Sequence, residues 1–319
     1  MAYSEQVLKR ARLRLEQAKA ERERENEQRR LDAYRRFPRI EEIDRELRLT
    51  MAKLMQTALR KGEDTTKAIE AIRDRNLSLQ AERAWILEAE DLDYEMPLCS
   101  QCGGSGYAGA VMCECLRELC RQEQKRELTS LLGNGRESFD SFRLDYYPDT
   151  VDVNLGVSPR RLMQSNFNIC RKYAYEFDRT SGNLLFSGAT GLGKTFLSAC
   201  IARTVSDRGH SVVYESAIRM FRDFENEKFG SSQEGQESRK YLDCDLLIID
   251  DLGTEMTTQF TVSTLYYIIN SRLMDNRATI ISTNLMPEAI EKRYSPQIAS
   301  RVVGSYRLIK FVGEDIRRR

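Results

Sequence analysis

Residues 183–195 read NLLFSGATGLGKT, and this stretch decides the fold of the 319-residue chain. The apolar run at its start predicts a buried strand, and the run TFLSACIARTVSD from Thr195 onward predicts a helix. Between them lies a glycine-rich turn that closes on Lys194 and Thr195. This order of strand, loop and helix is the setting of a phosphate-binding P-loop. A glycine-rich helix cap that binds nothing is the alternative, and the Lys-Thr pair at the correct spacing favours the P-loop.

Each residue type in this loop has a physical role in holding phosphate. Glycines allow successive backbone N–H groups to turn toward phosphate oxygens, and the helix that follows adds unpaired donors and the positive end of its dipole. Lys194 supplies a positive charge for the β- and γ-phosphates, and the Thr195 hydroxyl is placed to bind Mg²⁺. We therefore expect ATP and Mg²⁺ as cofactors. The expected nucleotide-binding residues of the loop are Gly188, Ala189, Thr190, Gly191, Leu192, Gly193, Lys194 and Thr195.

A second apolar run, LLII at residues 246–249, ends in two aspartates in the manner of a Walker B motif. A buried parallel strand of this kind delivers its carboxylates to the edge of the sheet beside the P-loop. We expect Asp250 to bind Mg²⁺ directly or through water. We expect Asp251 to polarise the attacking water, which is often the work of a glutamate in related ATPases.

A further strand, predicted at residues 278–283, is followed by Asn284. Its amide could hold the attacking water or the γ-phosphate, and a turn-starting asparagine is the alternative. Strands and helices alternate over residues 140–319, which predicts an α/β fold with a parallel sheet flanked by helices. Just ahead of the P-loop strand, Phe142, Tyr146 and Tyr147 could border an adenine ring or simply belong to the core.

Composition limits the possible function classes. The formal net charge is +1, which excludes a protein that binds nucleic acid as a simple polycation. No apolar run approaches the length of a membrane span, and the N-terminus lacks the apolar core of a signal peptide. We therefore expect a cytoplasmic protein without a membrane partner, whose eight cysteines are thiols or metal ligands rather than disulfides.

Residues 1–95 are rich in Glu, Arg, Lys, Leu and Ala, which predicts helices. Pro38 interrupts the pattern, and apolar positions then recur at helical spacing from Ile43 to Leu59. A third helix follows, so an antiparallel hairpin or a small bundle is expected. This region is either a coiled spacer or a module that docks another protein. Residues 123–139 are expected to form a linker helix before the nucleotide domain.

Residues 96–122 contain a cysteine pattern typical of a small zinc knuckle. Cys99 and Cys102 form a CxxC pair, a glycine-rich loop follows, and Cys113 and Cys115 return after it. Four thiolates around one Zn²⁺ suit a reducing compartment, and the site would be structural. The second pair is CxC, so Cys120 remains an alternative to Cys115 as the fourth ligand. A redox dithiol, or thiols without a metal, is the competing interpretation.

Five elements occur in order: GATGLGKT, LLIIDDLG, the ISTN strand end, the ASR element and the terminal GEDIRRR. Together they resemble the AAA+ ATPase domain of bacterial replicative-helicase loaders of the DnaC and DnaI type, over roughly residues 140–319. The helical region and the cysteine-rich segment resemble the DnaI branch. The resemblance implies that Asn284 is sensor 1, Arg301 the arginine finger and Arg317 sensor 2, and that no helical lid follows the last strand.

The resemblance also implies a function. It predicts an ATPase that self-associates through its AAA+ domain and loads a hexameric replicative DNA helicase onto single-stranded DNA, with the N-terminal region holding the helicase. Two alternatives remain, namely a transposition helper ATPase of the IstB type and a nucleotide-switched adaptor that hydrolyses little ATP. Arg219, Arg222 and Lys228 are weak candidates for DNA contacts, since basic side chains on a helix are usually only solvated.

Overall fold

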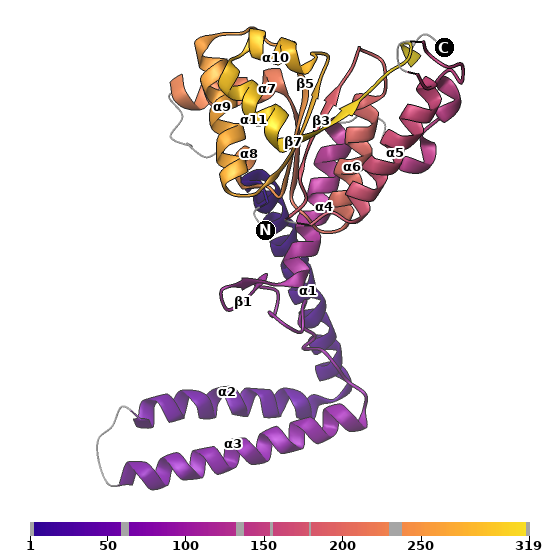
Figure 1. Ribbon diagram of the computed structural model, residues 1–319. Helices are drawn as coiled ribbons and strands as arrows, with labels where there is room; N and C mark the ends of the chain where they lie inside the picture. The colour runs from indigo at the N-terminus through magenta and orange to yellow at the C-terminus, as the bar shows by residue number, and fades with distance from the viewer. Residues whose placement is uncertain are drawn as a thin grey trace. The chain divides into compact units, whose positions relative to one another are not determined.

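The computed structural model describes residues 3–58, 64–131, 137–153, 156–178, 180–229 and 238–316 (Figure 1). The chain forms two compact units, one made of Met1–Arg12 with Leu116–Arg319 and the other of Leu13–Cys115. The first residues of the chain are thus grouped with the nucleotide domain. The domain boundaries expected near residues 95, 122 and 139 remain predictions.

The larger unit is built on a five-stranded sheet in the order β4-β5-β6-β3-β7, and every neighbouring pair is parallel. Its strands are β3 (Asn183–Ser187), β4 (Val212–Ser216), β5 (Leu246–Leu252), β6 (Ala278–Thr283) and β7 (Tyr306–Lys310). The three inner strands are buried on both faces, which explains why they read as unbroken apolar runs. The predicted parallel sheet flanked by helices is confirmed.

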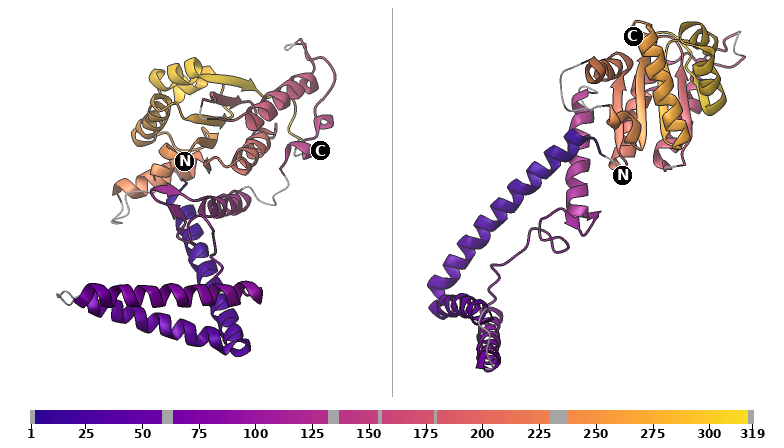
Figure 2. Two further views of the ribbon diagram at one scale, coloured as in Figure 1. Left: turned by 90° about the horizontal axis from the view of Figure 1, so that it is seen from below. Right: turned by 90° about the vertical axis from the view of Figure 1, so that its left-hand side faces the viewer.

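Helices cover both faces of this sheet (Figure 2). Alternate strand residues divide between two apolar clusters, so that Leu184 and Ile248 face one side while Leu185 and Leu247 face the other. The first cluster takes side chains from α5 (Pro159–Tyr175) and α6 (Lys194–Asp207). The second takes them from α7 (Ala217–Phe229), α8 (Arg239–Asp243), α9 (Gln259–Met274), α10 (Pro287–Arg293) and α11 (Pro296–Ser305). The P-loop therefore lies between a buried strand and the helices of the first face.

The β4 edge of the sheet is covered by α4 (Glu114–Leu131). The buried Gln124 side chain of this helix makes hydrogen bonds of the kind that a neighbouring strand would make. The Gln124 side chain accepts a hydrogen bond from the Val212 N–H at 3.0 Å and donates one to the His210 carbonyl at 2.9 Å. The start of α1 (Glu5–Arg36) packs here as well, where Arg10 pairs with Glu127 at 2.5 Å. Backbone groups of an edge strand are thereby satisfied, which removes a template for unwanted strand pairing.

The second unit contains most of α1 (Glu5–Arg36) and an antiparallel hairpin of α2 (Pro38–Ala58) and α3 (Asp64–Ala89), as predicted. Cross-pairs such as Arg39–Glu82 and Arg75–Glu46 match the antiparallel register. Ile43 is buried, whereas Met51 of the same apolar stripe is exposed; Leu59 lies outside the described residues. A short ribbon of β1 (Tyr107–Ala108) and β2 (Val111–Met112) follows. In the part of the chain that the structure describes, no helix is both long and apolar enough to span a membrane.

Candidate nucleotide and metal sites

The glycines of the P-loop are fixed by what lies against them. A Cβ atom on Gly188 would collide with the backbone carbonyl of Phe311, and one on Gly191 would collide with the carboxylate of Asp315. Gly191 also has φ of +77°, which a residue with a side chain rarely adopts. The Ile316 N–H donates to the Gly191 carbonyl at 3.0 Å. The segment after β7, residues 311–316, thus braces the loop from outside.

Lys194 is buried, and its ammonium lies inside the curve of the loop. Its Nζ donates to the carbonyls of Gly188 at 2.7 Å and Ala189 at 2.8 Å. The Thr195 hydroxyl lies 3.5 Å from Oδ1 of Asp250, which lies near the carboxyl end of β5. A hydroxyl and a carboxylate are hard oxygen ligands of the kind Mg²⁺ prefers, so these residues fit a magnesium nucleotide.

Asp250 is buried and held by hydroxyl groups that the sequence interpretation did not identify. The Tyr214 hydroxyl on β4 donates to Oδ2 at 2.7 Å, and the Ser282 hydroxyl on β6 donates to Oδ1. Burial and the neighbouring Asp250 charge raise the pKa of Tyr214 well above its usual value of 10, so the phenol stays protonated and keeps donating. In the strand sequence SVVYES, residues 211–216, successive side chains point to opposite faces. This alternation turns Tyr214 inward, and it was the feature of the sequence from which the contact with Asp250 could have been suspected.

Tyr214→Phe is expected to raise the Mg²⁺ concentration for half-maximal ATP hydrolysis by about tenfold, because residues that orient a metal ligand typically contribute that much to metal affinity. ATP binding without Mg²⁺ should be unchanged. The matched control is Tyr241→Phe, another buried tyrosine, whose hydroxyl donates to Asp223 at 2.6 Å. A Tyr214→Phe protein with the wild-type Mg²⁺ dependence would contradict the assignment.

Asp251 is exposed and has φ of +53°, a conformation that costs energy for a residue with a side chain. The pairing of β5 with β6 shifts register between Ile249 and Leu252, so Asp251 lies in a bulge. Bulges re-aim side chains next to active sites, and here Asp250 remains buried while its neighbour faces the open edge of the sheet. The role of Asp251 in polarising water remains a prediction.

Asn284 is exposed directly after β6, beside the loop that follows Asp251. Its Oδ1 is 3.4 Å from the place a Cβ on Gly253 would occupy. That loop is held by Glu255, a buried carboxylate that accepts from the Gly253 N–H at 2.9 Å and from the Tyr294 hydroxyl. The sequence interpretation did not identify Glu255. The structure thus brings the P-loop, both aspartates and Asn284 to the carboxyl edge of β3, β5 and β6.

The aromatic residues ahead of the P-loop divide between core and surface. Tyr147 is fully buried and its hydroxyl donates to the Leu192 carbonyl at 3.0 Å. Phe142 stacks on Tyr147 and on Phe167, with ring centroids 5.9 and 5.2 Å apart. These rings support the P-loop as core residues. Tyr146 is exposed, with the Arg143 guanidinium 5.1 Å from its ring.

The two predicted arginines have different outcomes. Arg301 on α11 donates to the Tyr266 hydroxyl at 2.7 Å and to Oδ1 of Asn270 at 2.9 Å, both on α9. These helices cover the face of the sheet opposite α6, so Arg301 is engaged away from the P-loop helix of its own chain. Its role as arginine finger remains a prediction. Arg317 lies outside the described residues.

The predicted cysteine ligands come together in the second unit. The sulfur atoms of Cys99, Cys102, Cys113 and Cys115 lie within 4.8 Å of one another. The Cys99–Cys113 and Cys102–Cys115 separations are 3.8 and 3.4 Å. Sulfurs bound tetrahedrally to zinc at about 2.3 Å are about 3.8 Å apart, so the cluster fits one Zn²⁺.

The structure also separates the two candidates for the fourth ligand. Cys115 belongs to the cluster, whereas Cys120 is fully buried in the larger unit. Cys115 is therefore the candidate ligand.

Comparison with known proteins supports the same domain. Residues 167–300 match the family model for IstB-like ATP binding protein. Over 136 residues the chain is 30% identical to the replicative helicase loader DnaC of Escherichia coli K12, which covers 41% of this chain and 54% of DnaC. Over 115 residues it is 32% identical to the chromosomal replication initiator protein DnaA of Campylobacter jejuni, covering 36% of this chain and 26% of DnaA.

Similar solved structures include the DnaC helicase loader and DnaI. The DnaC crystal structure has a TM-score of 0.45 at 20% identity and covers 55% of this chain and 98% of its own. The DnaI crystal structure has a TM-score of 0.46 at 20% identity and covers 60% of this chain and 99% of its own. In the sequence alignments, this chain spans about half the length of DnaC. The resemblance inferred from the motifs is confirmed: the chain carries an AAA+ domain of the IstB/DnaC type, homologous to the helicase loader DnaC.

Proposed function

We propose that this protein is an ATP-dependent loader that places a hexameric replicative DNA helicase onto single-stranded DNA during replication initiation or restart. The observation that carries the proposal is the buried Lys194 ammonium inside the P-loop, next to the pairing of Thr195 with Asp250. This arrangement suits a magnesium nucleotide. The similarity to a protein named replicative helicase loader supports the biological process.

In this proposal ATP binds across residues 188–195, and each catalytic residue acts at the carboxyl edge of the sheet. Mg²⁺, held by Thr195 and Asp250, would neutralise charge on the β- and γ-phosphates. Asp251 accepts a proton from the attacking water, and Asn284 orients that water. Arg301 of a neighbouring subunit stabilises the charge that develops on the γ-phosphate, and Arg317 serves as sensor 2.

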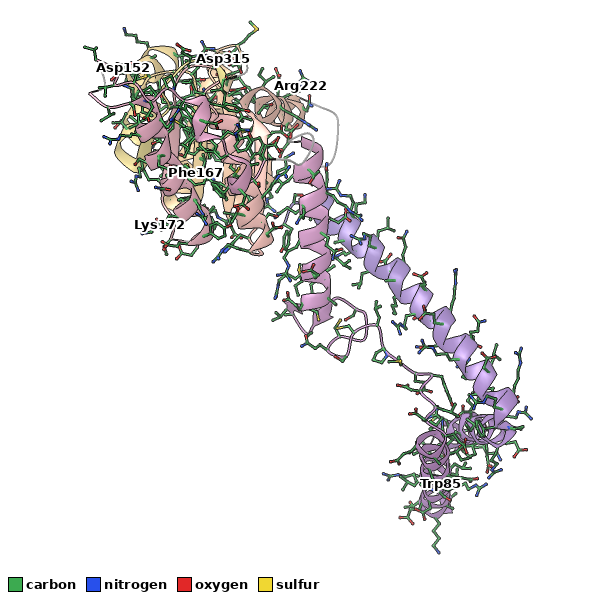
Figure 3. All side chains as sticks on the ribbon, turned by 90° about the vertical axis from the view of Figure 1, so that its right-hand side faces the viewer. Trp85, Asp152, Phe167, Lys172, Arg222 and Asp315 are labelled. Atoms are coloured by element: carbon green, nitrogen blue, oxygen red, sulfur yellow. The ribbon has the colours of Figure 1, made fainter. Side chains whose placement is uncertain are left out.

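The second unit would hold the helicase. Its α2–α3 hairpin exposes large apolar side chains, among them Trp85 at 70% exposure (Figure 3) and Leu77 at 63%. Trp and Leu at helical spacing on an open face suit a protein partner better than a solvated spacer. The four-cysteine cluster would bind a structural Zn²⁺ that stabilises the segment after the hairpin. We propose a cytoplasmic location and the predicted boundaries at residues 95, 122 and 139.

Two other functions predict different measurements. A transposition helper of the IstB type is favoured by the family model itself, and it would co-purify with a transposase rather than a helicase. A nucleotide-switched adaptor would bind ATP with turnover that neither DNA nor helicase stimulates. For DNA contacts Arg219, Arg222 and Lys228 remain weak candidates, since Arg219 already pairs with Glu215 at 3.6 Å.

The test is a loading assay with the full chain. A hexameric replicative helicase is supplied with circular single-stranded DNA coated by a single-strand-binding protein, and helicase retained on the circle is measured with ATP. Loading that depends on this protein and on ATP would support the proposal. A protein that neither binds the helicase nor increases its loading would refute it.

Lys194→Ala is expected to weaken ATP binding by about 100-fold, because charge-assisted hydrogen bonds to phosphate contribute about 3 kcal/mol. Binding is measured by titration with a fluorescent ATP analogue, and thermal unfolding checks that the variant is folded. Lys172→Ala is the control, because that lysine is exposed on α5 and pairs with Glu176. Equal ATP affinity for Lys194→Ala and wild type would refute the site.

A further inference from the structure

We infer that Tyr266 and Asn270 of α9 are positioning residues that hold the Arg301 guanidinium ready for the nucleotide of a neighbouring subunit. The inference rests on the proposed function, in which Arg301 acts across a subunit interface. It adds two residues that neither the motifs nor the comparisons assign.

The contacts around Arg301 fix the orientation of its guanidinium plane as well as its position. Nε donates to Oδ1 of Asn270 at 2.9 Å, and a terminal nitrogen donates to the Tyr266 hydroxyl at 2.7 Å. The guanidinium carbon lies 4.5 Å from the centroid of the Tyr266 ring. A planar cation held by two directional bonds and one aromatic ring has little rotational freedom left.

The partners of Arg301 leave its charge available. Among the residues that the structure describes, no carboxylate lies within ion-pair distance of it; its partners are an amide, a phenol and the Gln297 carbonyl at 3.4 Å. By contrast, Arg39 and Arg75 are paired with glutamates. A carboxylate would compete with a phosphate for the cation, whereas neutral partners orient the cation without neutralising it.

The α9–α11 pair does not need these contacts in order to pack. Leu265 and Ile269 of α9 and Ile298 and Val302 of α11 are all fully or almost fully buried in one apolar cluster. The Arg301 contacts lie at the margin of this core. Variants at Tyr266 and Asn270 should therefore fold, which makes a functional test meaningful.

The surroundings of Arg301 suit an interface between copies of the chain. The Asn270 amide also donates to the sulfur of Met274 at 3.5 Å, and Met274 is 75% exposed. Arginine, tyrosine and methionine are enriched where proteins meet. Orienting the arginine before assembly reduces the ordering cost when the interface forms.

The test uses mixed oligomers of two full-length variants. Lys194→Ala binds ATP about 100-fold more weakly but keeps an intact Arg301, and Arg301→Ala binds ATP but lacks the arginine finger. Mixing them should restore hydrolysis at interfaces where the first variant faces the nucleotide of the second. The first variant is called the donor and the second the acceptor.

Tyr266→Leu placed in the donor should lower the restored kcat by about tenfold, with KM for ATP unchanged, because a misplaced catalytic group loses transition-state stabilisation only. The same substitution in the acceptor should have no effect. Tyr266→Phe in the donor keeps the aromatic ring and should lower the restored kcat by about threefold. Asn270→Ala in the donor should lower the restored kcat by a factor between these two. Tyr267→Leu in the donor changes an exposed neighbouring tyrosine and should leave the restored kcat unchanged.

The outcomes separate the two ideas. If the mixture regains no activity, the proposed role of Arg301 across the interface fails. If the mixture regains activity and donor Tyr266→Leu retains it fully, the positioning inference is overturned. An equal loss from donor and acceptor would also overturn it, since that result indicates a general structural defect.

Discussion

Replacing Cys102 with serine is expected to abolish zinc binding and to unfold the segment of residues 98–115. Structural zinc sites contribute apparent binding free energies of about 10 kcal/mol or more, and this energy is also folding energy. The described segment has few other sources of stability, because β1 and β2 have two residues each and Gly103, Gly104 and Gly106 all have positive φ. The wild-type chain should contain one zinc per molecule.

Metal content of the purified full chain, measured by mass spectrometry, checks the first part of this prediction. Hydrogen exchange across residues 98–115, with and without a chelator, checks the second. Cys120→Ser is the matched control and should keep its zinc, because Cys120 lies outside the cluster. Wild-type protein without zinc, or a Cys102→Ser protein that keeps one equivalent, would contradict the site.

Arg301→Ala is expected to reduce the ATPase rate that self-association stimulates by about 1,000-fold, the lower range for an arginine finger. ATP affinity should be unchanged, since the side chain contacts α9 rather than the P-loop of its own chain. The measurement is kcat as a function of protein concentration, with ATP binding followed separately. Arg307→Ala, at an exposed arginine on β7, is the control. Undiminished stimulation in Arg301→Ala would show that another group serves this purpose.

Local motifs explain which parts of the site could be predicted. The P-loop and the two aspartates are specified by neighbours in sequence, because a strand, a tight turn and a helix start are each determined by residues close together in the chain. The parallel sheet follows from apolar runs that alternate with helices. The cysteine cluster follows from spacing, although only the structure distinguishes Cys115 from Cys120.

The parts that were not predicted depend on partners far apart in the chain. Gln124 closes the β4 edge through Val212, 88 residues away, and Tyr214 reaches Asp250 across 36 residues. Arg272 is fully buried and donates to the carbonyls of Cys244 and Ala278, although its position on a helix would suggest a solvated charge. No periodicity encodes such contacts, because they arise only when the sheet has assembled.

The bracing of the P-loop by residues 311–316 has a consequence for biosynthesis. The loop is made early in translation of the nucleotide domain, yet its outer support and the β7 strand beside β3 are made more than 100 residues later. Pairing over such a separation is a slow step in folding. A nascent chain should therefore acquire its affinity for ATP only after residues 306–316 have been made, so that captured nucleotide reports that β7 and the segment after it are in place.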